Sequence, residues 1–281
     1  MRITDFDIYK ELLRDKSGLM IDQDQCFLLD SRLVPIAKKW GYTSLEAMTA
    51  SLHAVPDNDL VHDVIEVMTA KDTSFFKDTW PFRMLSDEIF PYLKKNRGDS
   101  KKIRLWSCAS STGQEPYSAC LLFAEKGTEF SGWKPEVLAS DISASALEQS
   151  KQAIYSQFEV QRGVPVRLLL KHFKQIEGEN WQISPEIRRM VRHQSFNLID
   201  TMTALGKFDV IFCRNVLTGF EPDVRAKTIE KLCGRLEKDG FLIFGKGEKP
   251  DTPLLRPLHE KRGVYVLKDG PHRGSLAKNA D

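Results

Sequence analysis

The segment from Arg104 to Tyr117, RLWSCASSTGQEPY, constrains the fold most, because an apolar strand pattern runs straight into a small-residue turn. The turn holds Gly113 and is followed by a carboxylate, Glu115. Such a turn lets backbone N–H groups and one acid approach a ligand closely. A second apolar run, Val137 to Ser140, ends on Asp141. We therefore expect both acids at the carboxyl edge of one parallel sheet, where nucleoside ligands bind.

Two ligand classes fit this pattern. An acid after the second strand is also the ribose-binding feature of the NAD fingerprint, but that fingerprint carries three glycines. Only one glycine lies between Ala109 and Gln114, so a close backbone approach to a pyrophosphate has weak support. S-adenosylmethionine is a compact nucleoside without phosphates; its ribose diol would suit Asp141 and its ammonium Glu115. The spacing leaves both ligands open, because strand-turn-helix units with acids occur in unrelated α/β folds.

The chain divides into a helical part and an alternating part. The first eighty or so of its 281 residues show a 3.6-residue periodicity, and we expect Pro35 to bend or interrupt the second helix. Strand and helix patterns alternate from Lys101 onward, which is typical of a parallel sheet with crossover helices. Residues 241–245 and 263–268 are predicted as the last two strands. A turn signal within residues 174–192 predicts a small β-ribbon.

Charge and cysteine content exclude several classes of protein. The chain has 41 Lys and Arg against 39 Asp and Glu, and its net charge of +2 gives no global attraction to nucleic acid or a membrane. No stretch is long and apolar enough to span a bilayer, and the N-terminus lacks a secretory signal. We therefore expect a cytoplasmic protein with reduced cysteines. The five cysteines show no metal-binding spacing, so no metal site is expected.

A third buried-strand pattern, Phe208 to Cys213, ends in the polar pair Arg214-Asn215, which places Asn215 on the same edge as Asp141. With this segment the chain resembles the chemotaxis receptor methyltransferases, the CheR family, over nearly its whole length. Residues 155–173, YSQFEVQRGVPVRLLLKHF, are similar to members of proteobacterial type. The segments that carry the resemblance are MTAKDTSFFKD (68–78), RLWSCASSTGQEPYS (104–118), LASDISASALEQSKQAIYS (138–156), HQSFNLID (193–200) and FDVIFCRNVL (208–217).

The resemblance implies a fold and an activity. The fold is α/β, a Rossmann-like S-adenosylmethionine-dependent methyltransferase sheet with an N-terminal all-α domain and a small inserted β-subdomain. The division we expect is a helical domain at 1–83, the cofactor-binding domain at 84–270 with the ribbon at about 174–192, and a loose tail at 271–281. The implied activity is protein-glutamate O-methylation, which converts S-adenosyl-L-methionine to S-adenosyl-L-homocysteine.

The resemblance also carries cofactor contacts onto nine positions. Glu115 would hold the methionine ammonium and Asp141 the ribose hydroxyls, while Asn197 and Leu198 would border the adenine. A helix N-cap is a second, compatible interpretation of Asp141, and a turn or cap role is an alternative for Asn197 and Asn215. The predicted cofactor-binding residues are Lys71, Thr73, Lys77, Glu115, Asp141, Asn197, Leu198, Asn215 and Val216.

Departures from the family pattern gather at the expected reaction centre. The family's Asn-x-Thr-x-Phe-Phe-Arg reads KDTSFFK over residues 71–77. A mobile ammonium therefore replaces a planar guanidinium at Lys77, the predicted catalytic residue, and Lys71 adds a cation near a cationic cofactor. The tyrosine expected after the Arg-Asn pair is Gly219, which removes a hydroxyl and a wall of the pocket. The hypothesis is that turnover is reduced or redirected, and that Lys77→Arg with Gly219→Tyr raises methylation.

The implied partner is the acidic, glutamate-bearing helices of a methyl-accepting chemoreceptor. In the family a basic helix of the N-terminal domain meets them, and Arg32, Lys38 and Lys39 are the basic positions that remain here. A solvated helix face explains the same residues. The ribbon is a few residues shorter than in members that grip a receptor's C-terminal peptide, which favours recognition without such a tether.

Two other functions compete with receptor methylation. A catalytically weakened family member acting as a cofactor-binding regulator or scaffold is the alternative, and the features that favour it are Lys71, Lys77 and Gly219. Methylation of nucleic acid or a small molecule has less support, because the sequence shows no stripe of basic and aromatic residues.

Overall fold

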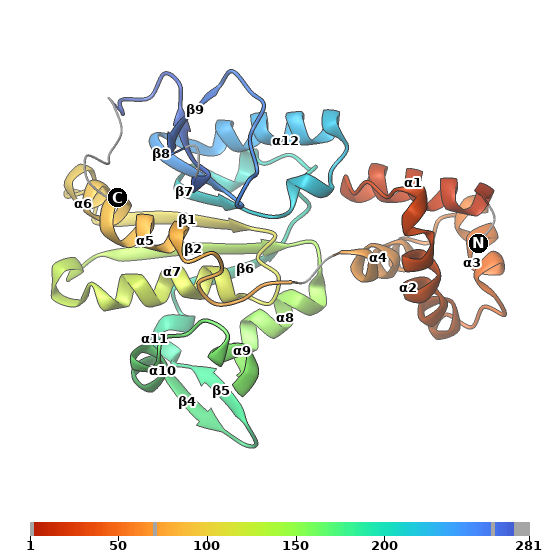
Figure 1. Cartoon of the computed structure of the whole chain (residues 1–281), viewed down its shortest axis with the longest axis horizontal. Helices are drawn as coiled ribbons and strands as arrows, with labels where there is room; N and C mark the ends of the chain where they lie inside the picture. Colours follow the sequence, from red (N-terminus) through yellow and green to blue (C-terminus); the bar gives the residue numbers. More distant parts are fainter. Residues whose placement is uncertain (1–2, 70–71, 260–261, 273–281) are drawn as a thin grey trace.

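The N-terminal part of the chain is helical, as predicted, and its helices lie together at one end of the sheet (Figure 1). The computed structural model describes residues 3–69, 72–259 and 262–272. α1 ends at Ser17 because the next residue, Gly18, takes a left-handed φ of +77°. α2 continues through Pro35 without interruption. The elements of this part are α1 (Ile3–Ser17), η1 (Gln23–Gln25), α2 (Cys26–Lys39), α3 (Leu45–Ala54) and α4 (Asn58–Met68).

Side chains at helical spacing form a separate apolar core for these helices. The buried face of α4 carries Leu60, Val64 and Met68, which recur at intervals of four residues. The helix begins at a proper N-cap, since the Asp57 carboxylate accepts hydrogen bonds from the N–H groups of Asp59 and Leu60. The N-terminal helices therefore bury their apolar faces mainly against one another.

The centre of the molecule is a seven-stranded sheet with the order β6-β2-β1-β7-β8-β10-β9. The first five strands in that order are parallel, and β10 runs antiparallel to both of its neighbours. The predicted alternation is confirmed, but β9 was not predicted, because its sequence LRPLH contains a proline and no apolar run. The strands are β1 (Lys102–Cys108), β2 (Lys134–Asp141), β6 (Val191–Ser195), β7 (Phe208–Cys213), β8 (Leu236–Phe244), β9 (Leu255–His259) and β10 (Val264–Leu267).

Helices cover both faces of this sheet (Figure 1). Along β1 the side chains alternate between two apolar cores, because Leu105 joins the core that contains α7 and Trp106 joins the core that contains α12. The remaining helical elements of this part are α5 (Trp80–Met84), η2 (Leu85–Ile89), α6 (Phe90–Asn96), α7 (Gln114–Glu125), η3 (Gly127–Phe130), α8 (Ala144–Gln152), η4 (Thr203–Leu205), η5 (Leu217–Gly219) and α12 (Pro222–Arg235).

A small antiparallel sheet projects beneath α7 and α8 in the view of Figure 1. The predicted ribbon is present as the pair β4–β5, with Gly178 at a φ of +70° in its turn. A third strand, β3, pairs with the other edge of β5 and lies outside the predicted range 174–192. The elements of this region are β3 (Ile154–Ser156), α9 (Gln157–Gln161), α10 (Val166–His172), β4 (Phe173–Ile176), β5 (Asn180–Ile183) and α11 (Pro185–Arg188).

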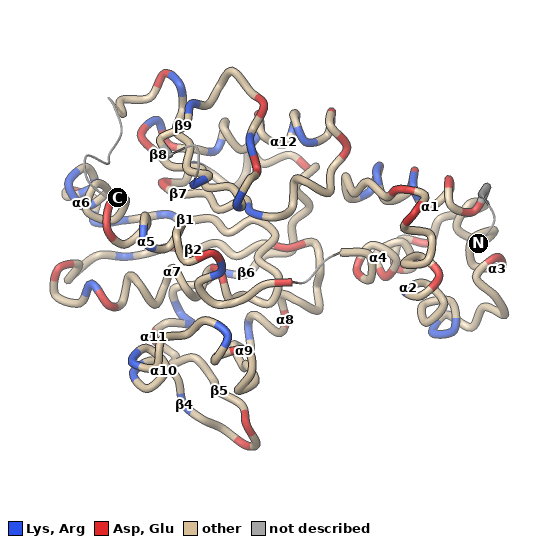
Figure 2. Tube along the Cα trace, viewed as in Figure 1, with Lys and Arg blue, Asp and Glu red and all other residues tan. Residues whose placement is uncertain are grey.

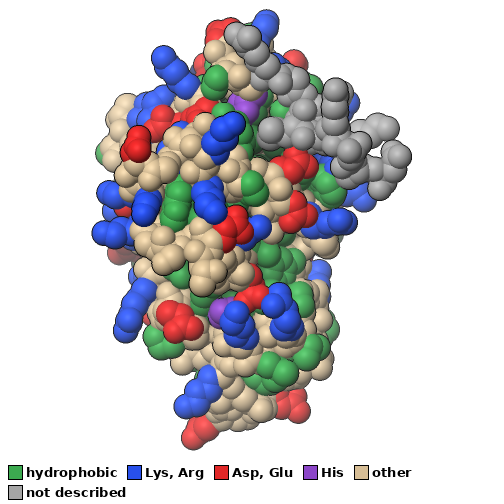
Figure 3. Space-filling view, turned by 90° about the vertical axis from the view of Figure 1, so that its left-hand side faces the viewer, with side chains coloured by type: hydrophobic (Ala, Val, Ile, Leu, Met, Phe, Trp, Pro, Cys, Tyr) green, Lys and Arg blue, Asp and Glu red, His purple; other side chains and the backbone are tan. Residues whose placement is uncertain are grey.

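Surface charge is mixed over the molecule. Acidic and basic residues follow one another along the chain trace (Figure 2), and the face in Figure 3 intersperses Lys and Arg with acidic and apolar side chains. In the described ranges, no helix combines the length and the apolar character that a bilayer crossing needs. The predicted loose tail falls largely on residues 273–281, which lie outside the described residues.

The order of the strands places their carboxyl ends side by side. Cys108 at the end of β1 is in register with Ser140 of β2 on one side and with Cys213 of β7 on the other. The crossovers leave β1 toward β2 in one direction and reach β7 in the other, so the carboxyl end of β1 is a topological switch point. Open α/β sheets bind ligands at such points.

Candidate functional site

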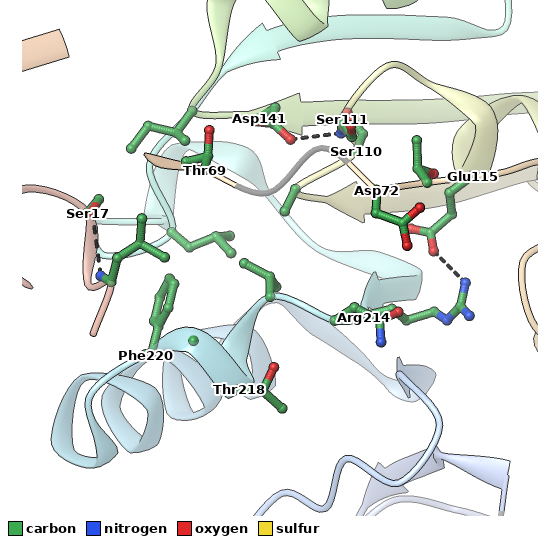
Figure 4. A pocket seen from close by; sticks show the side chains of 18 of the residues that line it. Ser17, Thr69, Asp72, Ser110, Ser111, Glu115, Asp141, Arg214, Thr218 and Phe220 are labelled. Carbon is green, nitrogen blue, oxygen red and sulfur yellow. Dashed lines mark hydrogen bonds and ion pairs between the residues drawn. The ribbon is translucent and has the colours of Figure 1, made fainter. Parts of the chain in front are cut away.

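A cavity of about 490 Å³ opens at this switch point (Figure 4). Its volume lies in the range of small-molecule sites. The structure brings together at its walls every predicted cofactor residue that it describes: Thr73, Lys77, Glu115, Asp141, Asn197, Leu198, Asn215 and Val216. Lys71 lies outside the described residues.

Asp141 is held rigidly at the end of β2. Its Oδ2 accepts a 2.7 Å hydrogen bond from the N–H of Ser111, and its Oδ1 accepts a 2.9 Å bond from the N–H of Ser143. The N-cap of α8 is Ser143, whose Oγ accepts from the N–H of Ala146, so the N-cap interpretation of Asp141 is wrong. The carboxylate instead braces the turn after β1 and faces the cavity with a fixed orientation (Figure 4).

The N–H groups of the turn after β1 donate hydrogen bonds to other groups of the protein, either in β2 or in the turn itself. The N–H of Ser110 donates to the carbonyl of Ser140, that of Ser111 to Asp141, and that of Gly113 to the carbonyl of Ser110. A pyrophosphate site needs such groups free to point at the ligand. This geometry removes the support for a dinucleotide and leaves room for a nucleoside without phosphates.

Glu115, in the first turn of α7, is fixed by two donors. Its Oε1 accepts from Ser107 Oγ at 2.7 Å, and its Oε2 accepts from Arg214 Nη1 at 2.8 Å. Arg214 also donates through Nη2 to Asp78 Oδ2 at 2.5 Å and to the carbonyl of Lys77 at 3.0 Å. The Arg214 side chain is only 2% exposed. One buried guanidinium therefore joins the end of β7, the start of α7 and the segment before α5.

Lys77 lies at the cavity wall but its ammonium is engaged. Its Nζ donates to Asp72 Oδ2 at 2.9 Å and to the Asp72 carbonyl at 3.1 Å. The hydrogen bond from Lys77 is the main cause that lowers the pKa of Asp72. The backbone on both sides of Lys77 is strained, because Phe76 before it and Asp78 and Thr79 after it all have positive φ values. The segment that carries Lys77 therefore has an unusual local shape at the site.

Asn215 has a left-handed backbone, with a φ of 60°, directly after Arg214. Its N–H donates to Glu248 Oε2 at 3.0 Å, and the N–H of Gly245 donates to the same oxygen at 2.6 Å. A Cβ at position 245 would come within 2.7 Å of Asn215 Nδ2 and of Glu248 Oε2, so a side chain there would displace both groups. The segment Gly245 to Glu248 thus fixes the loop that carries Asn215.

Asn197 is held by the chain itself. Its Nδ2 donates to the Lys16 carbonyl at 2.6 Å, and its Oδ1 accepts from the N–H of Ile199 at 3.3 Å. The amide therefore has the turn role that we considered as an alternative, and it also ties β6 to the end of α1. Leu198 is buried beside it and presents an apolar wall to the cavity.

Sequence reasoning missed part of the cavity wall. Arg214 had a signal, because an arginine directly after the buried strand β7 needs a buried partner. The contribution of the N-terminal helices had none, since their residues lie more than a hundred positions from Asn215. Gly219, which the sequence placed at the pocket wall, does line the cavity. The missed residues that line the cavity are Ser17, Leu19, Thr69, Asp72, Ala109, Ser110, Ser111, Ile142, Phe196, Arg214, Thr218 and Phe220.

The charge of the cavity wall fits a cationic nucleoside. Its described residues include three carboxylates, Asp72, Glu115 and Asp141, against two cations, Lys77 and Arg214. S-adenosylmethionine carries an ammonium, a carboxylate and a sulfonium, so its net charge of about +1 is complementary to one excess carboxylate. The residues present therefore fit this cofactor.

Comparisons with known proteins agree with the geometry. Residues 71–254 match the family model described as CheR methyltransferase, SAM binding domain. The chain is 32% identical over 248 residues to the chemotaxis protein methyltransferase Cher2 of Pseudomonas putida, covering 87% of this chain and 90% of that protein. It is 28% identical over 278 residues to chemotaxis protein methyltransferase 2 of Vibrio cholerae, covering 96% of this chain and 94% of that protein. The chain therefore belongs to the CheR family of S-adenosylmethionine-binding methyltransferases.

Proposed function

We propose that this protein transfers the methyl group of S-adenosylmethionine to glutamate side chains of chemoreceptors. The observation that carries the proposal is the pair of oriented carboxylates, Asp141 and Glu115, at the switch point of a CheR-family sheet. The relatives over most of the chain are named chemotaxis methyltransferases, so an enzyme is favoured over a regulator without catalysis.

The proposed cofactor contacts follow from the fixed side chains. Asp141 accepts hydrogen bonds from the ribose hydroxyls, and Glu115 attracts the methionine ammonium. Asn197 and Leu198 border the adenine, and Thr73, Asn215 and Val216 line other parts of the cofactor site. Lys71 belongs to the same proposed set.

The reaction needs orientation rather than a base. When bound, S-adenosylmethionine supplies a methyl group already activated on a sulfonium. A glutamate acceptor is ionised at neutral pH, so no side chain has to remove a proton. Lys77 is the cation placed to attract the acceptor carboxylate, which must come within about 3 Å of the methyl carbon. Exclusion of water by the apolar wall favours a step in which opposite charges neutralise.

We also propose that different parts of the chain bind the cofactor and the receptor. Residues 84–270, together with the cavity-lining residues Thr73 and Lys77 that precede them, hold the cofactor. The helices within residues 1–83 meet the receptor, and the tail at 271–281 is outside both roles. The receptor-facing residues are Lys38 and Lys39, which are exposed on α2. Arg32 is partly committed elsewhere, because its Nη1 donates to the carbonyls of Val67 and Met68 at the end of α4.

Calorimetric titration of S-adenosylmethionine and S-adenosylhomocysteine into the purified chain tests the proposed cofactor site. Micromolar binding is expected for the wild type, and Asp141→Ala should weaken it at least tenfold, because the ribose loses a charge-assisted hydrogen-bond acceptor. Asp99→Ala is the control, since Asp99 is exposed and remote from the cavity. A wild type that binds neither compound would overturn the proposed function.

Methylation of receptor fragments tests the role of Lys77. Lys77→Arg should raise kcat/KM about threefold or more, because a planar fork aligns a carboxylate better than a mobile ammonium. Lys77→Met should lower it by about tenfold, because the cation that attracts the acceptor carboxylate is lost. Equal activity in all three proteins would remove Lys77 from the acceptor site.

A further inference from the structure

A strap between α1 and α2 reaches across to the cavity. Its Leu19 forms an isolated antiparallel bridge with Phe220. The N–H of Met20 donates to the carbonyl of Gly219 at 2.7 Å, and the N–H of Glu221 donates to the carbonyl of Gly18 at 3.3 Å. The strap, residues 17–21, is therefore hydrogen-bonded to the segment that follows β7.

Close packing around Gly18 holds the strap against the sheet domain. A Cβ on Gly18 would come within 3.0 Å of Ile199 Cγ2 and 3.1 Å of the Phe220 ring, and the φ of +77° also excludes most side chains. Farther from the cavity, Glu66 of α4 accepts hydrogen bonds of 2.5 Å from Ser143 Oγ and Ser145 Oγ at the start of α8. The helical part is thus docked at two places, on the segment that follows β7 and on the start of α8.

Leu19 fills the space beside Gly219. A Cβ built on Gly219 would meet Leu19 Cδ2 at 3.6 Å, which is van der Waals contact. Both residues line the cavity, as do Phe220 and Ser17 (Figure 4). Leu19 also packs against two apolar clusters, that of the helical part and that of the sheet face beside α12. Gly219 has an ordinary backbone, so its conformation does not demand glycine.

We propose that Leu19 supplies the wall of the methyl-transfer pocket that residue 219 does not, so that a side chain from the helical part determines the shape of the site. This inference rests on the proposed function. An aliphatic wall excludes water and offers no hydroxyl, so it suits the methylene stem of a glutamate better than a group that seeks a hydrogen bond. The effects of Leu19 and residue 219 on the site are then coupled. The loss of the Leu19 side chain is offset when a side chain is added at position 219.

A double-mutant cycle tests this coupling. The variants are Leu19→Ala, Gly219→Tyr and their combination, with Leu12→Ala as the control, because Leu12 packs in the helical core but does not line the cavity. Gly219→Ala is added because its Cβ makes only an ordinary contact and should fold in any case. Each protein is measured for S-adenosylhomocysteine affinity by calorimetry, for kcat/KM on a receptor fragment, and for thermal unfolding.

Leu19→Ala should weaken S-adenosylhomocysteine binding about fivefold and kcat/KM about tenfold, because an apolar wall is lost. Leu12→Ala should change neither by more than about twofold. Because Leu19 already occupies the space beside residue 219, Gly219→Tyr alone should lower kcat/KM, in contrast to the gain that the family pattern suggested for this change together with Lys77→Arg. The combined variant should recover at least about fivefold over Leu19→Ala.

Three results would overturn the inference: equal effects of Leu19→Ala and Leu12→Ala, a gain in kcat/KM from Gly219→Tyr alone, or additive effects in the cycle. Binding and turnover by the wild type together with any of these leaves the proposed function intact. A wild type that binds neither cofactor form overturns both proposals.

Discussion

Arg214 is the residue on which most of the site's geometry converges. Its guanidinium bonds Glu115 and Asp78 and also reaches the backbone of Lys77, so one side chain holds three segments together. A buried cation between two carboxylates is costly to desolvate but costlier to remove, because removal leaves two acids close together. Its role is that of a positioning residue, since it orients Glu115 toward the cavity.

Arg214→Met should lower the free energy of unfolding by about 3 kcal/mol, because Glu115 and Asp78 would lose their shared partner. Urea denaturation at neutral pH measures this change. Arg189→Met is the matched control, as Arg189 is exposed and should shift the midpoint very little. A variant as stable as the control would show that the two acids find other partners.

At the scale of elements, the Glu125 carboxylate of α7 binds several side chains of α10, a helix of the small β-region. Glu125 at the end of α7 accepts from Lys171 Nζ at 2.8 Å and His172 Nε2 at 3.0 Å, and it pairs with Arg167 Nη2 at 2.5 Å. The hydrogen bond from Lys171 is the largest cause that lowers the pKa of Glu125 from 4.5 to about 2. Because two of the cationic partners are well exposed, screening reduces what these ion pairs contribute.

Glu125→Gln should reduce stability at pH 7 by about 1 kcal/mol. The folded-state pKa lies below the unfolded value, so the contribution is fully present above about pH 4.5 and is lost as the pH falls toward 2. The difference between wild type and Glu125→Gln in urea midpoints should therefore shrink between pH 5 and pH 3. A difference that stays constant over that interval would mean that packing, not charge, carries the effect.

At the scale of the whole molecule, the N-terminal helical part lies beside the sheet. It helps to enclose the cavity at the sheet's carboxyl edge. The strap at residues 17–21, the Asn197 bond to Lys16 and the Glu66 bonds to α8 dock this helical part on the sheet domain. On α2, Lys38 and Lys39 are exposed, and the ammonium of Lys39 lies 2.7 Å from Asp63 Oδ2. The surface of mixed sign elsewhere leaves partner choice to such local groups.

Lys38→Ala with Lys39→Ala should weaken binding to an acidic receptor helix about threefold to tenfold at low salt, and by less at 0.5 M salt, where charges are screened. Arg32 is left unchanged because its replacement would uncap α4. Lys95→Ala with Lys227→Ala removes the same charge from exposed sites on α6 and α12. Equal loss in both double variants would favour a general charge effect over a docking surface.

Local patterns in the sequence determined the alternation of strands and helices and the positions of the polar residues that follow them. Glu115, Asp141 and Asn215 could be placed at one edge because each directly follows a strand or its turn, and parallel strands share that edge. The small ribbon was equally visible, from a turn signal between two short apolar runs. The proline-containing edge strand β9 was not, because its residues carry no periodicity.

Tertiary structure alone decided which groups meet across long separations in the chain. Arg214 finds Asp78, Asn197 binds Lys16, and Leu19 fills the space beside Gly219, although more than a hundred residues separate each pair. Periodicity and turn chemistry act over a few residues, whereas these contacts depend on how whole elements dock. The sequence therefore determined the sheet and its acidic edge, and only the docked helical part decided the shape of the cavity.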